Sequence, residues 1–574
     1  MVTSMMALLV SPSSMAAGPK LTLSTQDRLD HDQPIVVNYS GLTPNEEVRI
    51  QQCKQGATLA SQCGGTTYAA ADSNGSGNLI FRVTRTNGSN VSVPAAPFLL
   101  CDEENLCEIR VASLDDLSNF VSQDITFVPD AGSCPKGLPG AVTGKGTAAL
   151  ARAFVSWGPV TCEDPISVSV DYVAESDKFG LDAFACGLVD YAITDQGLGA
   201  NTCAADGSSP KVAGLAPIAL TGISFAFNIR DGDTGQRVET LKLTSNLLTR
   251  IFTGQLSTLD TAEIRALNPG VDLPNKLFVS VRADQSAATL SVTEYFHATN
   301  KETYLAGGRQ NDFAGGPTDI YPQVPGVEPV SGEPKVLSSL TNPDPSPADD
   351  SSYGWIGYLS TAAAAFGALP SVTIVDSDGQ NGLKPTEASF TAAFKEATKA
   401  ADGSYKFDYT PSNPKSYPLT TISSIVLPQL PAGDAKIKTF ENFIAWAAIE
   451  GQRSEYLPQG YAPLPGVLSA SAISISKSIS QTPTPTTSPT PTPTPSTSTT
   501  TTSSFTNSFG SGSNTTTFDS GIAESAGVTT TTEAVRLSAF SESQVSSSPL
   551  GRLLVFALLG LFAGSAISTV RLRK

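Results

Sequence analysis

Short apolar runs typical of β-strands alternate with helix-type patterns from Gly140 onward, and this alternation constrains the fold more than any other feature of the chain. The segments, in order, are GAVTGKG, TAALARAFVSWG, ISVSVDYV, FGLDAFACGLV and DYAITD. Strands joined by helical crossovers pair in parallel, so the pattern predicts an α/β domain. Ligands of such sheets lie at the carboxyl ends of the strands, where the turns GKGTAA, AESDKFG and TDQGL fall.

Two long apolar segments indicate that this domain has two lobes. We expect APIALTGISFAFNI to run from one lobe into the other and YPLTTISSIVLPQ to return. The domain is predicted at residues 130–475, with lobe I at about 140–222 and 419–475 and lobe II at about 223–418. Such lobes form a hinged clamp with the ligand site between them. The Gly- and Pro-rich stretch Gly307–Ala348 is expected to be an insertion or loop without chemistry of its own.

The turn VRADQSAAT joins an alternating strand pattern to a helix-compatible segment. A strand-to-helix junction presents unpaired backbone N–H groups and the positive end of the helix dipole. Here it carries Arg282, Ser286 and Thr289, which favours an anion site. An ordinary surface turn with a capped helix remains the alternative.

The N-terminal part has short alternating segments about every ten residues, broken by turn clusters such as GLTPNEE, and lacks any long helical period. This pattern predicts an all-β antiparallel sandwich at residues 19–129. The eight cysteines fall into neighbouring pairs, and we expect pairing in sequence order, although eight cysteines permit about 105 connectivities. The predicted pairs are Cys53 with Cys63, Cys101 with Cys107, Cys134 with Cys162, and Cys186 with Cys203. Disulfides place the folded part outside the cytosol.

Charge and composition exclude several functions. A net charge of -17 with only 16% charged residues makes nucleic acid an unsuitable partner, because its binding depends on clustered Lys and Arg. The two histidines, His31 and His297, lie far apart without metal-ligand spacing. We therefore expect no metal, no cofactor and no enzymatic activity.

Both ends of the chain indicate export and membrane anchoring. Residues 1–18 are interpreted as the remnant of a signal peptide, with a disordered tail as the alternative. Residues 476–549 form a Thr/Pro/Ser-rich stalk whose composition cannot build a core, so we expect it to be disordered. An uncharged run, Leu553–Val570, predicts a single transmembrane helix at 550–570, and the basic tail 571–574 places that end in the cytoplasm. A buried core helix is one alternative, and a GPI signal is a weaker one, because the basic tail after the apolar run does not suit it.

Residues 21–128 resemble the neocarzinostatin family of actinobacterial apoproteins. The resemblance rests on VNYSGLTPNEEVRIQQC, on ADSNGSGNLIFRV, and on the two cysteine loops, including FLLCDEENLCEIRVAS. It implies an immunoglobulin-like sandwich with a ligand groove at most. A plain interaction or spacer module is the favoured interpretation.

The region from Gly140 to about Ala472 resembles the phosphate-binding protein of bacterial phosphate ABC transporters, which has a type 2 periplasmic-binding-protein fold. The matching motifs occur in order: IFTGQLSTLDTAEIRALNPGVDLPN, VRADQSAAT against RADGSGT, GWIGYL, KPTEASF, YPLTTISSIVL and LPQGYAPLP. The resemblance implies a small anion as ligand, with phosphate as the candidate, and no covalent chemistry.

The resemblance also implies roles for individual residues. Asp195 matches the family's aspartate, which accepts a hydrogen bond from a protonated phosphate oxygen, and Arg282 and Ser286 match its arginine and serine. Asp284 is positioned to orient Arg282. The predicted ligand-binding residues are Thr147, Asp195, Arg282, Asp284, Ser286 and Thr289.

Three segments depart from the family pattern. In the first loop Ala148 stands at the threonine position, with Thr147 one place early and Lys145 as a compensating charge. In the second loop Asp177 stands about where the family has a hydroxyl. Within the turn, Ala287 and Ala288 replace a glycine and a threonine. Hydrogen bonds to charged groups contribute roughly 1.5 to 3 kcal/mol each, so these losses weaken the predicted phosphate site, and a carboxylate in the pocket adds repulsion.

The sequence therefore predicts a multidomain, membrane-anchored extracellular solute-binding protein for phosphate or another oxyanion, which works by hinge closure. An ABC transporter or a cell-wall component is the predicted partner. The alternative is a degenerate clamp that serves as a cell-surface interaction or sensory module, and Asp177 filling the pocket would favour it.

Overall fold

The computed structural model describes residues 18–481, except 28, 31–32, 60–61, 86–100, 102–104, 115–116, 118–119, 128–137, 200–209, 309–311, 345 and 347–349. The predicted signal peptide, the stalk beyond Gln481 and the predicted transmembrane helix lie outside these residues. Among the helices that are described, none has the length and apolar character needed to cross a membrane.

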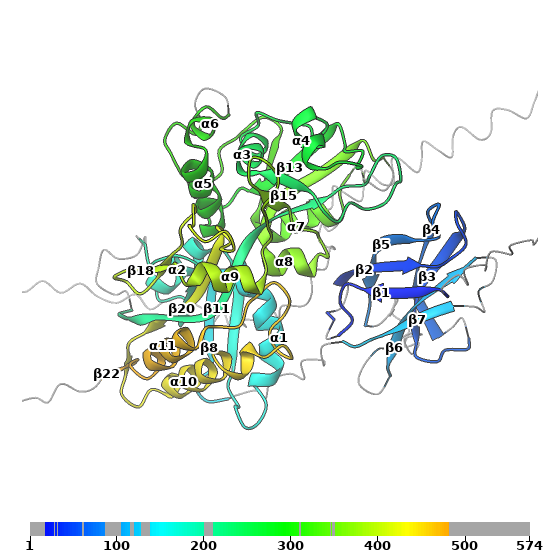
Figure 1. Cartoon of the computed structure of the whole chain (residues 1–574). Helices are drawn as coiled ribbons and strands as arrows, with labels where there is room; N and C mark the ends of the chain where they lie inside the picture. Colours follow the sequence, from blue (N-terminus) through cyan, green and yellow to red (C-terminus); the bar gives the residue numbers. More distant parts are fainter. Residues whose placement is uncertain are drawn as a thin grey trace, which may run out of the picture. The chain divides into compact units, whose positions relative to one another are not determined.

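The N-terminal domain consists of two antiparallel sheets that face each other across a shared core (Figure 1). Alternating burial along the strands, as in EVRIQQCK, sends Val48 and Ile50 inward, where they meet Ile35 and Phe81 of the opposite sheet. The three-stranded sheet has the order β1 (Lys20–Leu23), β2 (Gln33–Ser40), β5 (Gly77–Val83), and the four-stranded sheet the order β4 (Cys63–Ala70), β3 (Glu47–Lys54), β6 (Cys107–Ser113), β7 (Phe120–Ile125). The predicted β-sandwich is confirmed.

Two disulfides staple this domain as predicted, Cys53 to Cys63 and Cys101 to Cys107. Cys162 and Cys186 of the second domain are also disulfide-bonded. Their predicted partners, Cys134 and Cys203, lie outside the described residues, so those two pairings stay predictions.

The second domain is built on one eight-stranded mixed sheet (Figure 1). The strands, in sheet order, are β14 (Val327–Val330), β13 (Lys276–Arg282), β15 (Tyr353–Ser360), β11 (Val212–Asn228), β20 (Thr420–Pro428), β10 (Tyr191–Thr194), β8 (Val142–Thr147) and β9 (Val170–Glu175). The pairs β8–β9, β8–β10, β13–β14 and β13–β15 are parallel, as the strand and helix alternation predicts. Their carboxyl ends carry Thr147, Glu175, Thr194 and Arg282.

The long strand β11 connects two lobes. It pairs with β20 up to Gly222 and with β15 from Ile223 onward, so one continuous strand belongs to both halves of the sheet. We refer to the half with β8, β9 and β10 as lobe I and to the half with β13, β14 and β15 as lobe II. Every residue of β20 is buried, which explains why its sequence is apolar or small and hydroxylated throughout.

Helices cover the sheet and complete one large core. Aromatic clusters fill each lobe, with Phe154 stacked on Tyr172 in lobe I and Phe225 on Phe296 in lobe II. The helices before β11 or after β20 are η2 (Ala148–Leu150), α1 (Ala151–Thr161), α2 (Asp177–Ala185), α10 (Ala435–Ala447), η4 (Glu450–Gln452) and α11 (Gly466–Ser476). Those between are α3 (Ser245–Phe252), α4 (Ala262–Leu267), α5 (Ala287–Thr299), α6 (Lys301–Leu305), α7 (Gly332–Thr341), α8 (Thr361–Phe366) and α9 (Glu387–Phe394).

Short strands form three minor sheets. They are β12 (Lys242–Thr244) with β16 (Thr373–Val375) and β17 (Gly382–Leu383), β18 (Thr398–Lys399) with β19 (Tyr405–Lys406), and β21 (Leu430–Pro431) with β22 (Ser480–Gln481).

The prediction of a loop at Gly307–Ala348 is wrong for part of the region, and its alternative, an insertion, stays a prediction. This region supplies β14 at the edge of the large sheet and α7, which packs on β13 and β15. Glu333 of α7 is buried and accepts hydrogen bonds from the N–H and the hydroxyl of Ser360, at 2.6 and 2.9 Å, next to the start of α8. A four-residue strand that contains proline, followed by a helix that opens in Gly-Glu-Pro, has too little periodicity to be recognised.

Candidate anion-binding site between the lobes

The junction between β13 and α5 forms the lobe II side of the site. Ser286 is the N-cap of α5, and its hydroxyl accepts a hydrogen bond from the Thr289 N–H at 3.2 Å. The Thr289 hydroxyl bonds in turn to Ser286 and to the Tyr358 hydroxyl, at 2.9 and 2.7 Å. The N–H of Ala287, the first residue of this thirteen-residue helix, donates to Asp177 of lobe I at the positive end of the helix dipole.

Arg282, the last residue of β13, is 2% exposed and is fixed in place. Its Nε donates to Asp284 at 3.1 Å and its Nη2 bonds to the same carboxylate, while Asp284 also accepts the Gly332 N–H at 3.0 Å. Burial alone would lower the pKa of Arg282, but the hydrogen bonds and charge of Asp284 raise it, so the guanidinium is charged. Arg282 and Ser286 at the two ends of the turn are buried, whereas Ala283 is exposed and Asp284 and Gln285 are half-buried. The choice between an anion site and an ordinary capped surface turn therefore stays a prediction.

Thr147 and Asp195 lie on the lobe I side, at the ends of β8 and β10. The Thr147 hydroxyl donates to one carboxylate oxygen of Asp195 at 2.6 Å, and the hydroxyl of Ser423 from β20 donates to the other. Burial and the nearby charge of Asp177 raise the pKa of Asp195 to about 7, although both hydroxyl bonds act in the opposite direction. Asp195 is therefore poised to gain or lose a proton near neutral pH.

The carboxylate of Asp177 occupies the space between the two sides. It accepts the N–H of Asp195 at 2.7 Å through Oδ1 and the N–H of Ala287 at 3.3 Å through Oδ2. The side chain is 5% exposed, and burial raises its pKa, while the two N–H groups and the charge of Arg282 oppose the shift. We call this set of donors, the N–H groups of Asp195 and Ala287 beside Arg282, the anion seat.

Local sequence explains how Asp177 reaches the seat. It is the first residue of α2, which is capped by Ser176, whose hydroxyl accepts the Phe179 N–H at 3.3 Å. A Cβ at Gly180 would lie 2.5 Å from the carbonyl oxygen of Lys145, so only glycine lets α2 pack this closely on the end of β8.

Three hydrogen bonds join the lobes at the seat. One is the Ala287 N–H to Asp177; the others are Arg282 Nη2 to the Glu175 carbonyl and Gln196 Nε2 to the Ala287 carbonyl, at 3.2 and 3.3 Å. One of these bonds ends on the Asp177 carboxylate and the other two end on backbone carbonyls, so the lobes are in direct contact at the seat.

The structure brings together the predicted residues in two groups, Thr147 with Asp195 and Arg282 with Asp284. Ser286 and Thr289 bond to each other, and Thr289 also bonds to Tyr358, so the two hydroxyls support the helix start. Lys145 does not compensate for the missing threonine, because it pairs with Glu175 at 3.1 Å. Sequence reasoning missed Ser423, Gln196 and Tyr358, although the first lies within the YPLTTISSIVL motif.

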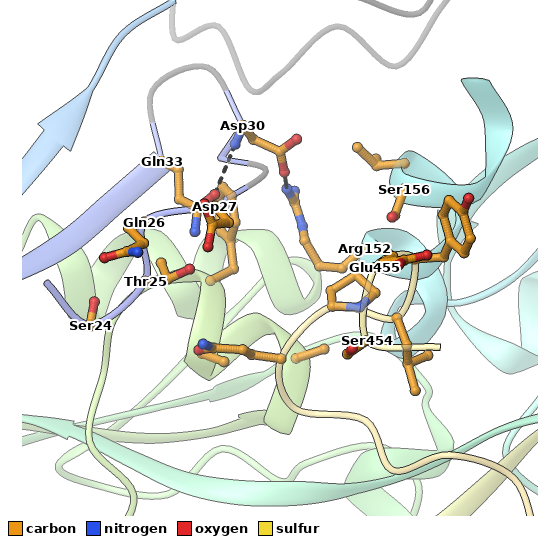
Figure 2. Close-up of a pocket in the computed structure, with 18 of the residues that line it drawn as sticks. Ser24, Thr25, Gln26, Asp27, Asp30, Gln33, Arg152, Ser156, Ser454 and Glu455 are labelled. Carbon is orange, nitrogen blue, oxygen red and sulfur yellow. Dashed lines mark hydrogen bonds and ion pairs between the residues drawn. The ribbon is translucent and has the colours of Figure 1, made fainter. Parts of the chain in front are cut away.

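A separate hollow of about 460 Å³ lies away from the seat (Figure 2). Arg152 of α1 donates to Asp30 there at 2.8 Å, and the Asp30 N–H donates to Gln33 at 2.9 Å. No predicted site residue lines this hollow. Within the described part of the chain, no group of three or more His, Cys, Asp or Glu side chains is arranged to hold a metal ion.

Two α/β lobes that share one long strand, with an N–H donor from each lobe meeting at one buried carboxylate, have the architecture of domains that close around a ligand. A sequence model described as the PBP superfamily domain matches residues 133–450. The chain therefore belongs to the PBP superfamily.

Similar proteins include the phosphate-binding protein PstS of Methanocaldococcus jannaschii, which is 27% identical over 319 residues, covering 52% of this chain and 76% of the relative. Phosphate-binding protein PstS 2 of Mycobacterium tuberculosis is 27% identical over 308 residues, with the same coverage of 52% and 76%. A solved phosphate-binding protein from Stenotrophomonas maltophilia is 14% identical, with a TM-score of 0.41 and coverage of 58% of this chain and 93% of that chain. Macromomycin, at 22% identity and a TM-score of 0.16, covers 19% of this chain and 99% of its own.

Proposed function

We propose that this protein is an extracellular solute-binding protein whose two lobes close around an oxyanion, with inorganic phosphate as the first candidate. The resident ligand-binding groups are Thr147, Asp195, Arg282, Asp284, Ser286 and Thr289, of which the last two act by supporting the start of α5. The protein performs no covalent chemistry in this proposal.

The observation that carries the proposal is the set of groups that surround the Asp177 carboxylate. A carboxylate is itself an oxyanion, and here it is held by two backbone N–H groups and a nearby buried guanidinium, one N–H coming from each lobe. Charge-assisted hydrogen bonds of this type are the strong ones in proteins, and they suit carboxylate and phosphate oxygens alike. The seat therefore has the chemistry of an oxyanion site.

The relatives supply the choice of phosphate, because those compared are phosphate-binding proteins. The sequence supports a location at the cell surface. A Thr/Pro-rich stalk is followed by an apolar run, Leu553–Val570, that would anchor the folded domains there. A phosphate ABC transporter is the corresponding partner.

Calorimetric titration of the full chain with phosphate and sulfate tests this function. We expect saturable binding of phosphate to the wild type, and at least tenfold weaker binding to Arg282→Gln, because a hydrogen bond to a charged group contributes roughly 1.5 to 3 kcal/mol. Arg250→Gln, which removes an arginine that pairs with Glu263 in the same lobe, is the matched control. No heat at millimolar phosphate from a chain that still unfolds cooperatively would reject the proposal.

A second candidate function is a cell-surface interaction or sensory module that keeps the clamp fold without binding phosphate. The observation that favours it is again Asp177, since a seat already occupied by a buried carboxylate needs no external anion. Failure of both phosphate and sulfate to bind the wild type would select this candidate.

A further inference from the structure

Asp177 uses the same donors that a bound oxyanion would need. A backbone N–H donates one strong hydrogen bond, and the N–H groups of Asp195 and Ala287 are both engaged by the two oxygens of this carboxylate. An external anion and the Asp177 carboxylate therefore exclude each other from the seat.

Electrostatics lead to the same conclusion. The groups that face Asp177 are Arg282 from β13, Asp195 directly after β10, and the positive start of α5. The buried guanidinium of Arg282 is already paired with Asp284, so its single positive charge only partly offsets the charge of the Asp177 carboxylate. A second anion at the seat would add like charge in a buried site, which is strongly unfavourable.

Asp177 also links the lobes directly. It belongs to α2 of lobe I and accepts the N–H of Ala287 from lobe II, and the Glu175 carbonyl two residues before it accepts Arg282. In a binding protein of this type the ligand bridges the lobes; here a side chain of the protein makes the bridge.

We propose that Asp177 determines which ligands this cleft accepts: its carboxylate occupies the seat as an internal anion that holds the lobes together, and an external oxyanion binds only by displacing it. The identity of the displacing ligand as phosphate rests on the proposed function, whereas the role of Asp177 as lobe bridge does not.

The test uses the full chain as wild type, Asp177→Ser, Asp177→Asn and Asp171→Ser. Asp171 is an exposed aspartate on β9, so its replacement removes the same charge from the same lobe without touching the seat. Two readouts are needed: phosphate affinity by calorimetry, and hydrogen exchange of the peptides that contain the Asp195 and Ala287 amides, without ligand.

We expect Asp177→Ser to bind phosphate at least tenfold more tightly than the wild type and to exchange both amides at least tenfold faster when ligand-free. Asp171→Ser should match the wild type in both readouts. If Asp177→Ser does not fold, Asp177→Asn replaces it, with changes in the same direction and of smaller size.

Other outcomes separate the two proposals. Equal or weaker phosphate binding by Asp177→Ser would overturn the displacement role while leaving the proposed function intact. Binding by Asp177→Ser alone, with none by the wild type, would support the internal anion and reject phosphate binding by the native protein. If neither protein binds phosphate, the proposed function is rejected, and hydrogen exchange then tests the lobe bridge alone. Faster exchange of the two amides in Asp177→Ser would support the bridge, and unchanged exchange would overturn it.

Discussion

Asp195 and Asp177 are two carboxyl groups in one buried environment, and the charge of Asp177 affects the protonation of Asp195. Asp195 is held by the hydroxyls of Thr147 and Ser423, which favour the charged form, but burial and Asp177 favour the neutral form and raise its pKa to about 7. A pKa raised on folding means that the folded state binds the proton more tightly than the unfolded chain does.

The first prediction concerns pH and stability. The folded pKa of Asp195 is about 7 against an ordinary value of 3.8. Its contribution to stability is therefore fully present below about pH 4 and is lost as pH rises to about 7, by on the order of 4 kcal/mol. The free energy of unfolding of the wild type relative to Asp195→Asn, measured by urea denaturation, should fall across this window. Parallel pH profiles for the two proteins would contradict the assignment.

The junction of β13 with α5 is the element on which the seat depends. Ser286 caps this helix and thereby sets the direction in which the Ala287 N–H points. The same helix start also receives support from Tyr358, whose hydroxyl oxygen accepts the Arg282 N–H at 3.3 Å.

Removing this cap should affect both stability and the seat. Ser286→Ala should lower the free energy of unfolding by about 1 kcal/mol, because an N-cap hydroxyl contributes that much. Thr386→Ala is the control, since Thr386 caps α9 through a capping box and touches no residue of the seat. Both variants should be destabilised similarly in thermal unfolding, but only Ser286→Ala should accelerate hydrogen exchange at Ala287. Equal exchange in the two would mean that the cap does not position the seat.

The β13–α5 junction can be predicted from the sequence, whereas the contacts of Asp177 cannot. The difference is how far apart in the sequence the interacting residues lie. The β13–α5 junction is recognisable because its strand alternation, capping serine and helix follow one another locally. The occupancy of the seat by Asp177 is not, because the carboxylate meets amides 18 and 110 residues away. The sequence indicates that Asp177 stands about where the family has a hydroxyl and that a carboxylate there would repel an anion. The two hydrogen bonds that hold this carboxylate are visible only in the structure.

For the whole molecule, the order of domains follows from composition and pattern, while their details depend on tertiary packing. The sandwich is predictable because apolar side chains recur at every second residue of its strands. The parallel strand pairs are predictable because strand patterns alternate with helix patterns along the chain. The edge strand β14 is not, because VEPV acquires its conformation from pairing with β13 rather than from local preference.

The apolar run Leu553–Val570 should anchor the chain in a membrane. The full chain should fractionate with membranes, whereas a chain ending at residue 549 should be released, because it lacks the apolar run Leu553–Val570. A variant lacking half of the stalk, 476–549, should stay with the membrane and serves as the control for truncation itself. Release of the full chain in a carbonate or salt wash would contradict a membrane-spanning anchor.

The most direct test of the central claim, that an oxyanion seat lies between the lobes and is held by Asp177 until a ligand displaces it, is a crystal structure of the protein at saturating phosphate. We predict phosphate within hydrogen-bonding distance of the Asp195 and Ala287 N–H groups and of Arg282, with the Asp177 carboxylate withdrawn from both amides. A structure in which Asp177 keeps both bonds, now 2.7 and 3.3 Å, with phosphate absent from the cleft or bound elsewhere, would contradict the account.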